Sequence, residues 1–126
     1  MVLGLIQDPG AYSPRACDCS FCTRHAAAYI SDAQGSLSLE AKEPGKLMTY
    51  RQGSHSADFL LCQDCGVLVG AVYREGDVTY ATINVRILDQ GVSLGREVTG
   101  SPQKLSAEEK TARWKQLWFR SITPLF

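Results

Sequence analysis

Short apolar runs separated by turn signals predict a chain built mainly from β-strands. Alternating apolar and polar positions, or β-branched residues between turn residues, predict strands at 2–6, 36–40, 47–51, 58–61, 67–73 and 78–85. Turn signals stand at Asp8-Pro9-Gly10 and Glu43-Pro44-Gly45, and Arg74-Glu75-Gly76-Asp77 predicts a hairpin between the last two strands. Glycines punctuate residues 91–100, which predicts a loop there with one short strand.

One helix is predicted near the C-terminus, at about 106–120. Ser106 and Glu109 have the spacing of a capping box, in which a serine oxygen accepts from a first-turn amide while the glutamate reaches back. Its buried stripe is predicted to contain Leu105, Ala112, Trp114, Leu117 and Trp118, with both tryptophans packing in the core. An alanine run predicts a short helical turn at 24–29, and Thr123-Pro124 is expected to end any continuation of the C-terminal helix. The predicted fold class is mainly β, with antiparallel sheets and a C-terminal α-helix.

Length and charge narrow the class of protein. The 126 residues fit a single domain, 1–126, and 44% hydrophobic with 21% charged residues is the balance of a globular protein. Thirteen basic residues face thirteen acidic ones, so nothing points to a nucleic acid or an anionic membrane as partner. The first ten residues lack a basic leader, and their apolar run is too short for a signal peptide or a membrane span. We therefore expect a cytoplasmic protein.

The five cysteines form two tight clusters, Cys17-Asp-Cys19-Ser-Phe-Cys22 and Cys62-Gln-Asp-Cys65-Gly66. An odd number cannot pair completely within one chain, and disulfide scaffolds usually spread their cysteines along the sequence. A CxxC turn aims two thiolates at one point, which suits Zn²⁺, and a following glycine lets the chain turn sharply. The clusters therefore predict zinc ligands and not disulfide partners.

Two other interpretations of the cysteines are weaker. Buried, reduced thiols can serve packing alone, but packing does not call for such close spacing. A thioredoxin-like redox pair precedes a helix in a βαβ unit, whereas Gly66 leads into a β-rich run. Metal binding remains the favoured interpretation.

Three segments together resemble the family of glutathione-dependent formaldehyde-activating enzymes, which includes centromere-protein-V-like proteins. The resemblance rests on residues 14–22, 59–67 and 83–89 and covers about residues 2–90. It implies a β-tent fold of small twisted antiparallel sheets around zinc–cysteine sites. It also implies that Cys17, Cys19 and Cys22 form a zinc site with one open coordination position. Cys62 and Cys65 would be half of a closed four-cysteine structural site.

The sequence departs from this family upstream of Cys17. The family's Gly-x-Cys-x-Cys-Gly hairpin is missing, because residues 1–16 contain no cysteine. Three explanations compete: a misassigned start or truncated chain, a lost structural zinc, or one zinc shared by two chains in a homodimer. We favour the first explanation, since residues 2–6 resemble the tail of a strand. A grouping of all five cysteines around a single zinc is a further alternative.

An open three-thiolate zinc site suits carbon–sulfur chemistry. Three thiolates make zinc a weaker Lewis acid than three histidines do, but the metal readily accepts a fourth sulfur. The expected substrate is thus a small thiol such as glutathione, bound as thiolate, which adds to formaldehyde or another aldehyde, or is released from such an adduct. This is a zinc-dependent carbon–sulfur lyase, and the resemblance implies formation of S-(hydroxymethyl)glutathione. The alternative is a non-catalytic zinc module for structure or partner binding, which a closed ligand shell would support.

Other polar residues near these motifs have less specific roles. His25 lies three residues after Cys22 and is expected to be a hydrogen-bonding neighbour of the site or, alternatively, the fourth zinc ligand. His55 is expected to be solvated. Arg24, Lys46 and Arg51 are ordinary surface charges or partners for the carboxylates of a glutathione-like ligand, and Tyr50 and Tyr80 are expected to be half-buried strand residues.

Overall fold

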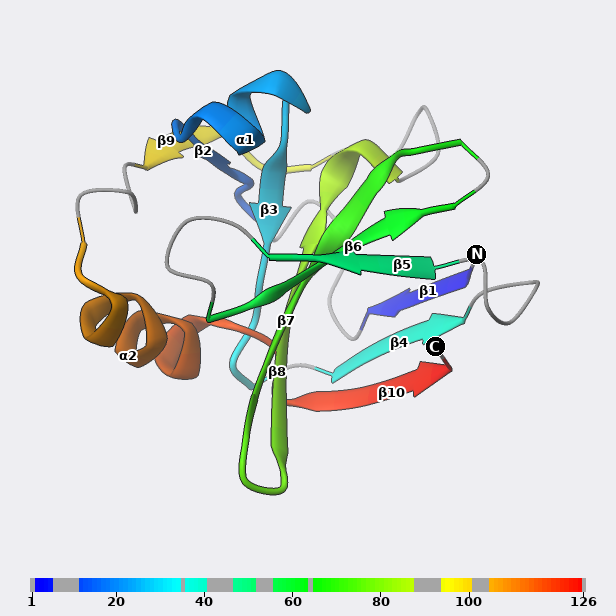
Figure 1. Cartoon of the computed structure of the whole chain (residues 1–126), viewed down its shortest axis with the longest axis vertical. Coiled ribbons are helices and arrows are strands. Elements are labelled where there is room, and N and C mark those ends of the chain that lie inside the picture. Colours follow the sequence, from blue (N-terminus) through cyan, green and yellow to red (C-terminus); the bar gives the residue numbers. More distant parts are fainter. Residues whose placement is uncertain are drawn as a thin grey trace.

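A computed structural model describes residues 2–5, 12–34, 36–40, 47–51, 56–63, 65–87, 94–100 and 105–125. It is mainly β with one long helix near the C-terminus, as the sequence predicts (Figure 1). None of the helices in these ranges is long and apolar enough to cross a membrane. The predicted turns at 8–10 and 43–45 lie outside the described residues.

Seven strands form the larger sheet, in the order β5-β6-β7-β8-β3-β2-β9. Their bounds are β5 Leu47–Tyr50, β6 Asp58–Cys62, β7 Leu68–Glu75, β8 Val78–Asn84, β3 Ala28–Ile30, β2 Arg15–Cys17 and β9 Val98–Gly100. The predicted hairpin joins β7 and β8, with Glu75 opposite Val78 and Gly76 at a φ of +59° in the turn. A short 3₁₀ helix, η2 (Val85–Ile87), follows β8.

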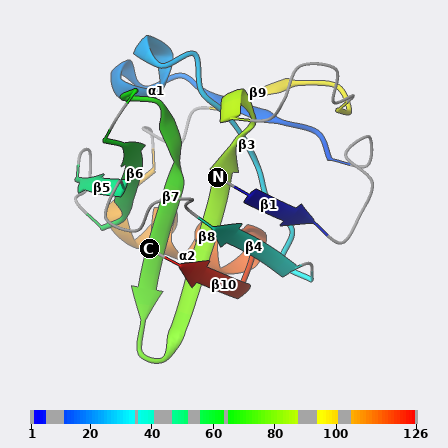
Figure 2. The ribbon, with the colours of Figure 1, turned by 90° about the vertical axis from the view of Figure 1, so that its right-hand side faces the viewer.

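Three further strands form a second sheet, in the order β1 (Val2–Leu5), β4 (Ser36–Glu40) and β10 (Ser121–Leu125). Figures 1 and 2 show this sheet on one side of the long β7–β8 hairpin and the C-terminal helix on the other. The antiparallel prediction is wrong in two places, because β9 runs parallel to β2 and β10 runs parallel to β4. The helix does not continue past Thr123-Pro124, and Pro124 lies in β10, at the edge of its sheet, where a strand tolerates proline.

The main core lies along β7 and β8 and receives residues from both ends of the chain. Ile30, Leu60, Val69, Ile83 and Phe119 are each at most 1% exposed. Gly70 is needed at its place in β7, because a Cβ there would overlap the carbonyl oxygen of Thr82 on β8. The two strands therefore pack more closely at this point than any larger residue would allow.

Two helices, α1 (Ser20–Arg24) and α2 (Ala107–Leu117), complete the fold. The capping box of α2 is confirmed, since Ser106 Oγ accepts from the Glu109 amide at 3.1 Å and Glu109 Oε1 accepts from the Ser106 amide at 3.0 Å. The helix ends at Leu117 and not near residue 120, because Phe119 forms an antiparallel bridge with Ala81. Backbone amides and carbonyls of Phe119 and Ala81 bond reciprocally at 2.9 Å.

The predicted buried stripe of α2 is only partly right. Trp118, the residue that caps the helix, is 7% exposed and packs with Ala57 and Ala71, so its predicted core role is confirmed. No residue within α2 itself is buried, and Ala112 faces solvent. The helical turn predicted at 24–29 is also wrong, because the helix begins at Ser20 and β3 follows at Ala28.

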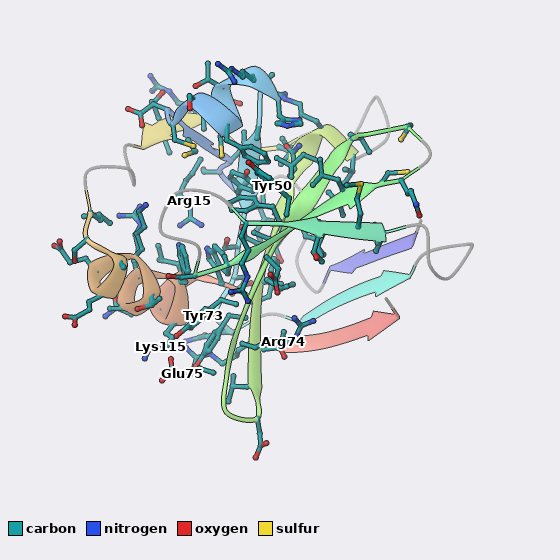
Figure 3. The ribbon with its side chains drawn as sticks, viewed as in Figure 1. Arg15, Tyr50, Tyr73, Arg74, Glu75 and Lys115 are labelled. Carbon is teal, nitrogen blue, oxygen red and sulfur yellow. The ribbon has the colours of Figure 1, made fainter. Side chains whose placement is uncertain are left out.

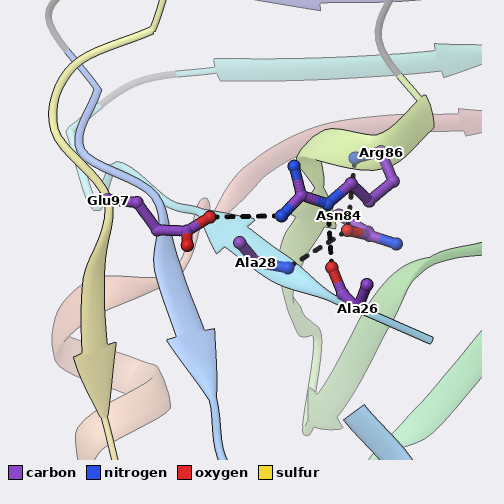
Figure 4. Close-up of polar contacts among 5 residues, drawn as sticks. All are labelled: Ala26, Ala28, Asn84, Arg86 and Glu97. Carbon is purple, nitrogen blue, oxygen red and sulfur yellow. Dashed lines mark hydrogen bonds and ion pairs between the residues drawn. The ribbon is translucent and has the colours of Figure 1, made fainter. Parts of the chain in front are cut away.

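Asn84 anchors the segment between α1 and β3 to the larger sheet (Figure 4). Its side chain is 1% exposed, accepts from the amides of Ala28 at 3.3 Å and Arg86 at 3.2 Å, and donates to the Leu68 carbonyl at 2.8 Å. Arg86 in turn donates to the Ala26 carbonyl at 2.8 Å. Ala26 has a φ of +51°, so this bond braces a left-handed turn next to the cysteine segment.

Candidate metal centre

Three cysteine sulfurs come together where β2 passes into α1. Cys17 is the last residue of β2, Cys19 caps the N-terminus of α1, and Cys22 lies inside that helix. Their Sγ atoms all lie within 4.8 Å of one another. With Zn–S bonds of about 2.3 Å, a tetrahedral site requires sulfurs roughly 3.8 Å apart, so small side-chain rotations are enough to accommodate the ion.

Hydrogen bonds hold two of these sulfurs in place. The Cys22 amide donates to Cys19 Sγ at 3.4 Å, which also caps the first turn of α1. The Cys22 sulfur lies 3.1 Å from the Tyr29 hydroxyl, and the Cys22 residue is only 2% exposed. Tyr29 belongs to β3, so the larger sheet fixes the position of the most buried sulfur.

The hydrogen bond between Cys17 and Cys22 shifts the pKa values of these two thiols in opposite directions. The hydrogen bond with Cys22 is the main reason that the pKa of Cys17 falls to about 6, although burial opposes the change. The same bond, followed by burial, raises the pKa of Cys22 well above its ordinary value. Burial, and secondly the charge of Cys22, raises the pKa of Tyr29, which keeps that hydroxyl protonated and able to donate to a Cys22 thiolate.

The other predicted ligands lie apart from this cluster. Cys62 ends β6 and Cys65 is exposed in the turn that follows. The predicted sharp turn is present, since Gly66 has a φ of +76° and its amide donates to the Cys62 carbonyl at 2.8 Å. Among the residues that the structure describes, the group able to bind a metal contains Cys17, Cys19 and Cys22 and neither of these two cysteines.

His25 does not join the cluster either. Its backbone amide caps α1, and its ring lies 4.8 Å from the Phe21 ring. Within the described ranges, no histidine or carboxylate supplies a fourth ligand atom to the three sulfurs. The second predicted histidine, His55, lies outside the described residues, as does Lys46.

The three clustered cysteines line a cavity of about 570 Å³. Figure 1 shows α1 and α2 on the same side of the larger sheet, and the cavity takes its lining from both helices and from strands between them. The wall that α2 supplies consists of Lys110, Arg113, Trp114 and Leu117, which have the i, i+3, i+4, i+7 spacing of one helix face. This helix therefore covers a cavity, which explains why none of its residues is fully buried.

Arg15 extends from β2 into the space between α1 and α2 (Figure 3). It lines the cavity and donates to Ser31 Oγ at 2.8 Å. Burial, and secondly the positive charge of Arg113, lowers the pKa of Arg15 from its ordinary value. The positive charges of the two guanidinium groups thus repel each other across this space.

The cations that line the cavity are not those that the sequence singles out. Arg24 is exposed and outside the lining, and Arg51 forms an ion pair with Asp58 at 2.8 Å. The sequence holds two clues to these cations. Arg15 stands two residues before Cys17, and Lys110 and Arg113 share a helix face with Trp114. None of these signals predicts that β2 and α2 meet.

The sequence predicts that Tyr50 and Tyr80 are half-buried, and the structure confirms this for one of them. Tyr80 is half-buried as predicted and stacks against Tyr73. Tyr50 is 51% exposed, so its predicted half-burial is wrong, and its ring stacks on Phe21 with centroids 5.6 Å apart. Phe21 lies in α1 between two of the clustered cysteines, so Tyr50 stands beside the candidate metal centre.

A protein from Rhodobacter sphaeroides, whose crystal structure was determined as a structural genomics target, is similar to this chain. It is 28% identical, with a TM-score of 0.51, over 78% of this chain and 88% of that one. No family model matches the sequence, and no curated protein matches it. The similarity shows that another protein shares the arrangement of strands and helices, and it names no activity.

Proposed function

We propose that the chain is a zinc-dependent carbon–sulfur lyase in which Cys17, Cys19 and Cys22 hold Zn²⁺ and leave one coordination position facing the cavity. The observation that carries the proposal is that all three cysteines line a cavity of about 570 Å³, while the described residues provide no fourth ligand. Three protein ligands with an exchangeable fourth position are the arrangement of catalytic zinc sites, whereas structural sites have four.

The donor set fits zinc. Thiolates are ligands that zinc prefers, and a buried cysteine such as Cys22, held by the Tyr29 hydroxyl, cannot swing into water. That hydroxyl donates to the Cys22 sulfur when the thiol is deprotonated, as a neighbour that orients a metal ligand does. The bound ion would supply one function, the binding of a substrate thiol as its thiolate at neutral pH.

The remaining chemistry concerns the substrates and the walls of the cavity. The thiolate sulfur forms a bond to the aldehyde carbon, the carbonyl π pair moves to oxygen, and that oxygen takes up a proton, so that the proton lost by the thiol is balanced. The reverse sequence splits the adduct. Apolar side chains of Phe59, Trp114 and Trp118 line the cavity and reduce the water that competes for the aldehyde.

The specific substrates follow from the family resemblance. We assign glutathione as the thiol and formaldehyde as the aldehyde, with S-(hydroxymethyl)glutathione as the adduct. The same resemblance proposes a β-tent fold, a cytoplasmic location and a second, structural zinc at Cys62 and Cys65. The turn after β6 supports the structural site, because Cys62 ends that strand and Cys65 follows in the turn that the Gly66 amide closes on the Cys62 carbonyl. The other two ligands of that structural site would come from a second chain, because residues 1–16 contain no cysteine.

The test measures how fast glutathione, formaldehyde and their adduct interconvert. Zinc-loaded protein is added to the equilibrium mixture, and the exchange rate is measured by NMR magnetisation transfer. We expect an accelerated exchange that Cys19→Ser removes and Cys65→Ser retains. Exchange at the rate of buffer alone, in protein with full zinc occupancy, would reject the enzyme and leave a non-catalytic zinc module.

A further inference from the structure

We propose that Arg15, Arg113 and Lys110 form an anion subsite in the cavity, separate from the three cysteines, so that the substrate thiol carries a carboxylate at its other end. That the substrate is a thiol rests on the proposed function. That it carries a carboxylate rests on residues that are not metal ligands. The inference concerns which thiols the cavity accepts.

Apart from the three cysteines, the charge of the described cavity lining has one sign. Among the described residues that line the cavity, three carry a positive charge and none is an aspartate or a glutamate. None of the three cations forms an ion pair with a carboxylate in the part of the chain that the structure describes. Like charges close together in a partly enclosed space repel each other, so a bound anion would relieve a cost that the free protein carries.

A chain of hydrogen bonds orients the Arg15 guanidinium. Thr82 donates its only hydroxyl proton to the Ile30 carbonyl at 3.0 Å, so Ser31, 2.6 Å away, must donate to Thr82 Oγ1. Ser31 Oγ is then an acceptor for Arg15, which can only donate. The three hydrogen bonds therefore run in one direction, from Arg15 through Ser31 and Thr82 to the carbonyl of Ile30 in β3.

This chain of bonds leaves most of the guanidinium available. Arg15 has five N–H groups, and among the described residues Ser31 is its one side-chain acceptor. Thr82 and Arg15 both line the cavity, and Ser31 connects them. A guanidinium held from behind loses little freedom when an anion binds in front of it.

Helix α2 brings the second guanidinium to the same cavity. Lys110 and Arg113 lie one turn apart on the face that lines it, next to Trp114. Arg113 is exposed as well as lining, so it stands where the cavity opens to solvent. A planar carboxylate matches the fork of an arginine, and an apolar linker between carboxylate and thiol would lie against the Trp114 ring.

The experiment compares thiols that differ only in charge. Zinc-loaded protein is titrated by calorimetry with mercaptoalkanoates of increasing chain length, each paired with its neutral amide. We expect at least one acid to bind about tenfold or more tightly than its amide. Arg15→Gln and Arg113→Gln should each remove most of that preference, because each weakens binding of the acid more than binding of the amide.

The variants are chosen so that misfolding cannot imitate the result. Arg15→Gln is a mild change, because the glutamine side chain keeps an amide donor for Ser31, and the Arg113 side chain is itself exposed, so its substitution leaves packing intact. Arg96→Gln is the matched control, because Arg96 is exposed, loses the same charge and lies outside the cavity lining. An acid-to-amide ratio near one in the unmodified protein, or a ratio that Arg15→Gln leaves unchanged, would overturn the proposal.

A second measurement needs neither zinc nor a thiol. Trp114 and Trp118 line the cavity, so their fluorescence is quenched by solutes that enter it. Quenching by iodide should fall about twofold in Arg113→Gln, while quenching by neutral acrylamide should not change. If no thiol binds but iodide keeps this dependence, the proposed function fails and the anion subsite stands. If iodide and acrylamide respond alike, the anion subsite fails.

Discussion

The hydroxyl oxygen of Tyr29 lies 3.1 Å from the sulfur of Cys22, and both residues are buried. Tyr29 belongs to β3, which pairs with β2 on one side and β8 on the other, so this contact joins the cysteine cluster to the middle of the larger sheet. The position of the most buried metal ligand is thus set by the fold and not by the cysteine segment alone.

Removal of the Tyr29 hydroxyl should weaken metal binding. Because hydrogen-bonding neighbours orient metal ligands, we expect Tyr29→Phe to lower zinc affinity about tenfold, measured by competition with a chromophoric chelator. Tyr12→Phe is the matched control, since Tyr12 is 5% exposed and donates to Asp32 at 3.4 Å, away from the cluster. Equal affinities in the unmodified protein and Tyr29→Phe would show that the hydroxyl does not support the site.

Asn84→Ala should destabilise the whole domain. The substitution leaves the buried Ala28 amide and the Leu68 carbonyl without their partner, which should cost about 2–3 kcal/mol of unfolding free energy. Urea denaturation measures this cost. Gln34→Ala, at an exposed position, should change stability by less than about 0.5 kcal/mol. A similarly small effect of Asn84→Ala would contradict the anchoring role.

Two glycines in the β7–β8 hairpin should respond differently to alanine. A Cβ at Gly70 would overlap the Thr82 carbonyl oxygen, so Gly70→Ala must push the strands apart and should cost roughly 3 kcal/mol or more. Gly76 has a positive φ but open space around it, so Gly76→Ala should cost only roughly 1 kcal/mol. Thermal unfolding of both variants checks the order, which the reverse ranking would disprove.

Cys17 should be a reactive thiol when metal is removed. Its pKa of about 6 means that it is ionised above pH 6, and the thiolate is the form that reacts with iodoacetamide. In reduced, chelator-treated protein, alkylation of Cys17, followed by mass spectrometry, should therefore rise through pH 6. Alkylation of a free cysteine, which has a pKa of about 8.5, should rise at a pH roughly two units higher. Zinc should suppress the reaction, and a Cys17 profile like that of free cysteine would refute the shift.

Local patterns predict the long elements and the three-cysteine cluster. Strands β7 and β8 combine β-branched residues with a clear turn at Gly76, and the Ser106–Glu109 box marks the start of α2, so each is determined by neighbouring residues. The spacing of Cys17, Cys19 and Cys22 similarly brings three sulfurs together within one turn of chain. These features need no information about distant segments.

The features that the sequence does not predict depend on long-range contacts. Strands β2 and β3 have only three residues each and form because they pair with each other and with β8 and β9. The parallel pairings of β9 and β10 depend on chain crossovers that no local pattern encodes. Arg15 and Arg113 lie 98 positions apart and meet only because α2 folds back over the cavity, which is why the cationic wall is found from the structure.

The most direct test of the central claim is the zinc content of the reduced protein in the double variant Cys62→Ser/Cys65→Ser. The account predicts about one zinc per chain, because Cys17, Cys19 and Cys22 alone form the site that faces the cavity. Addition of Cys19→Ser should then remove the metal. A double variant that is folded but contains no zinc would contradict the account, because the five cysteines would then share a single closed site.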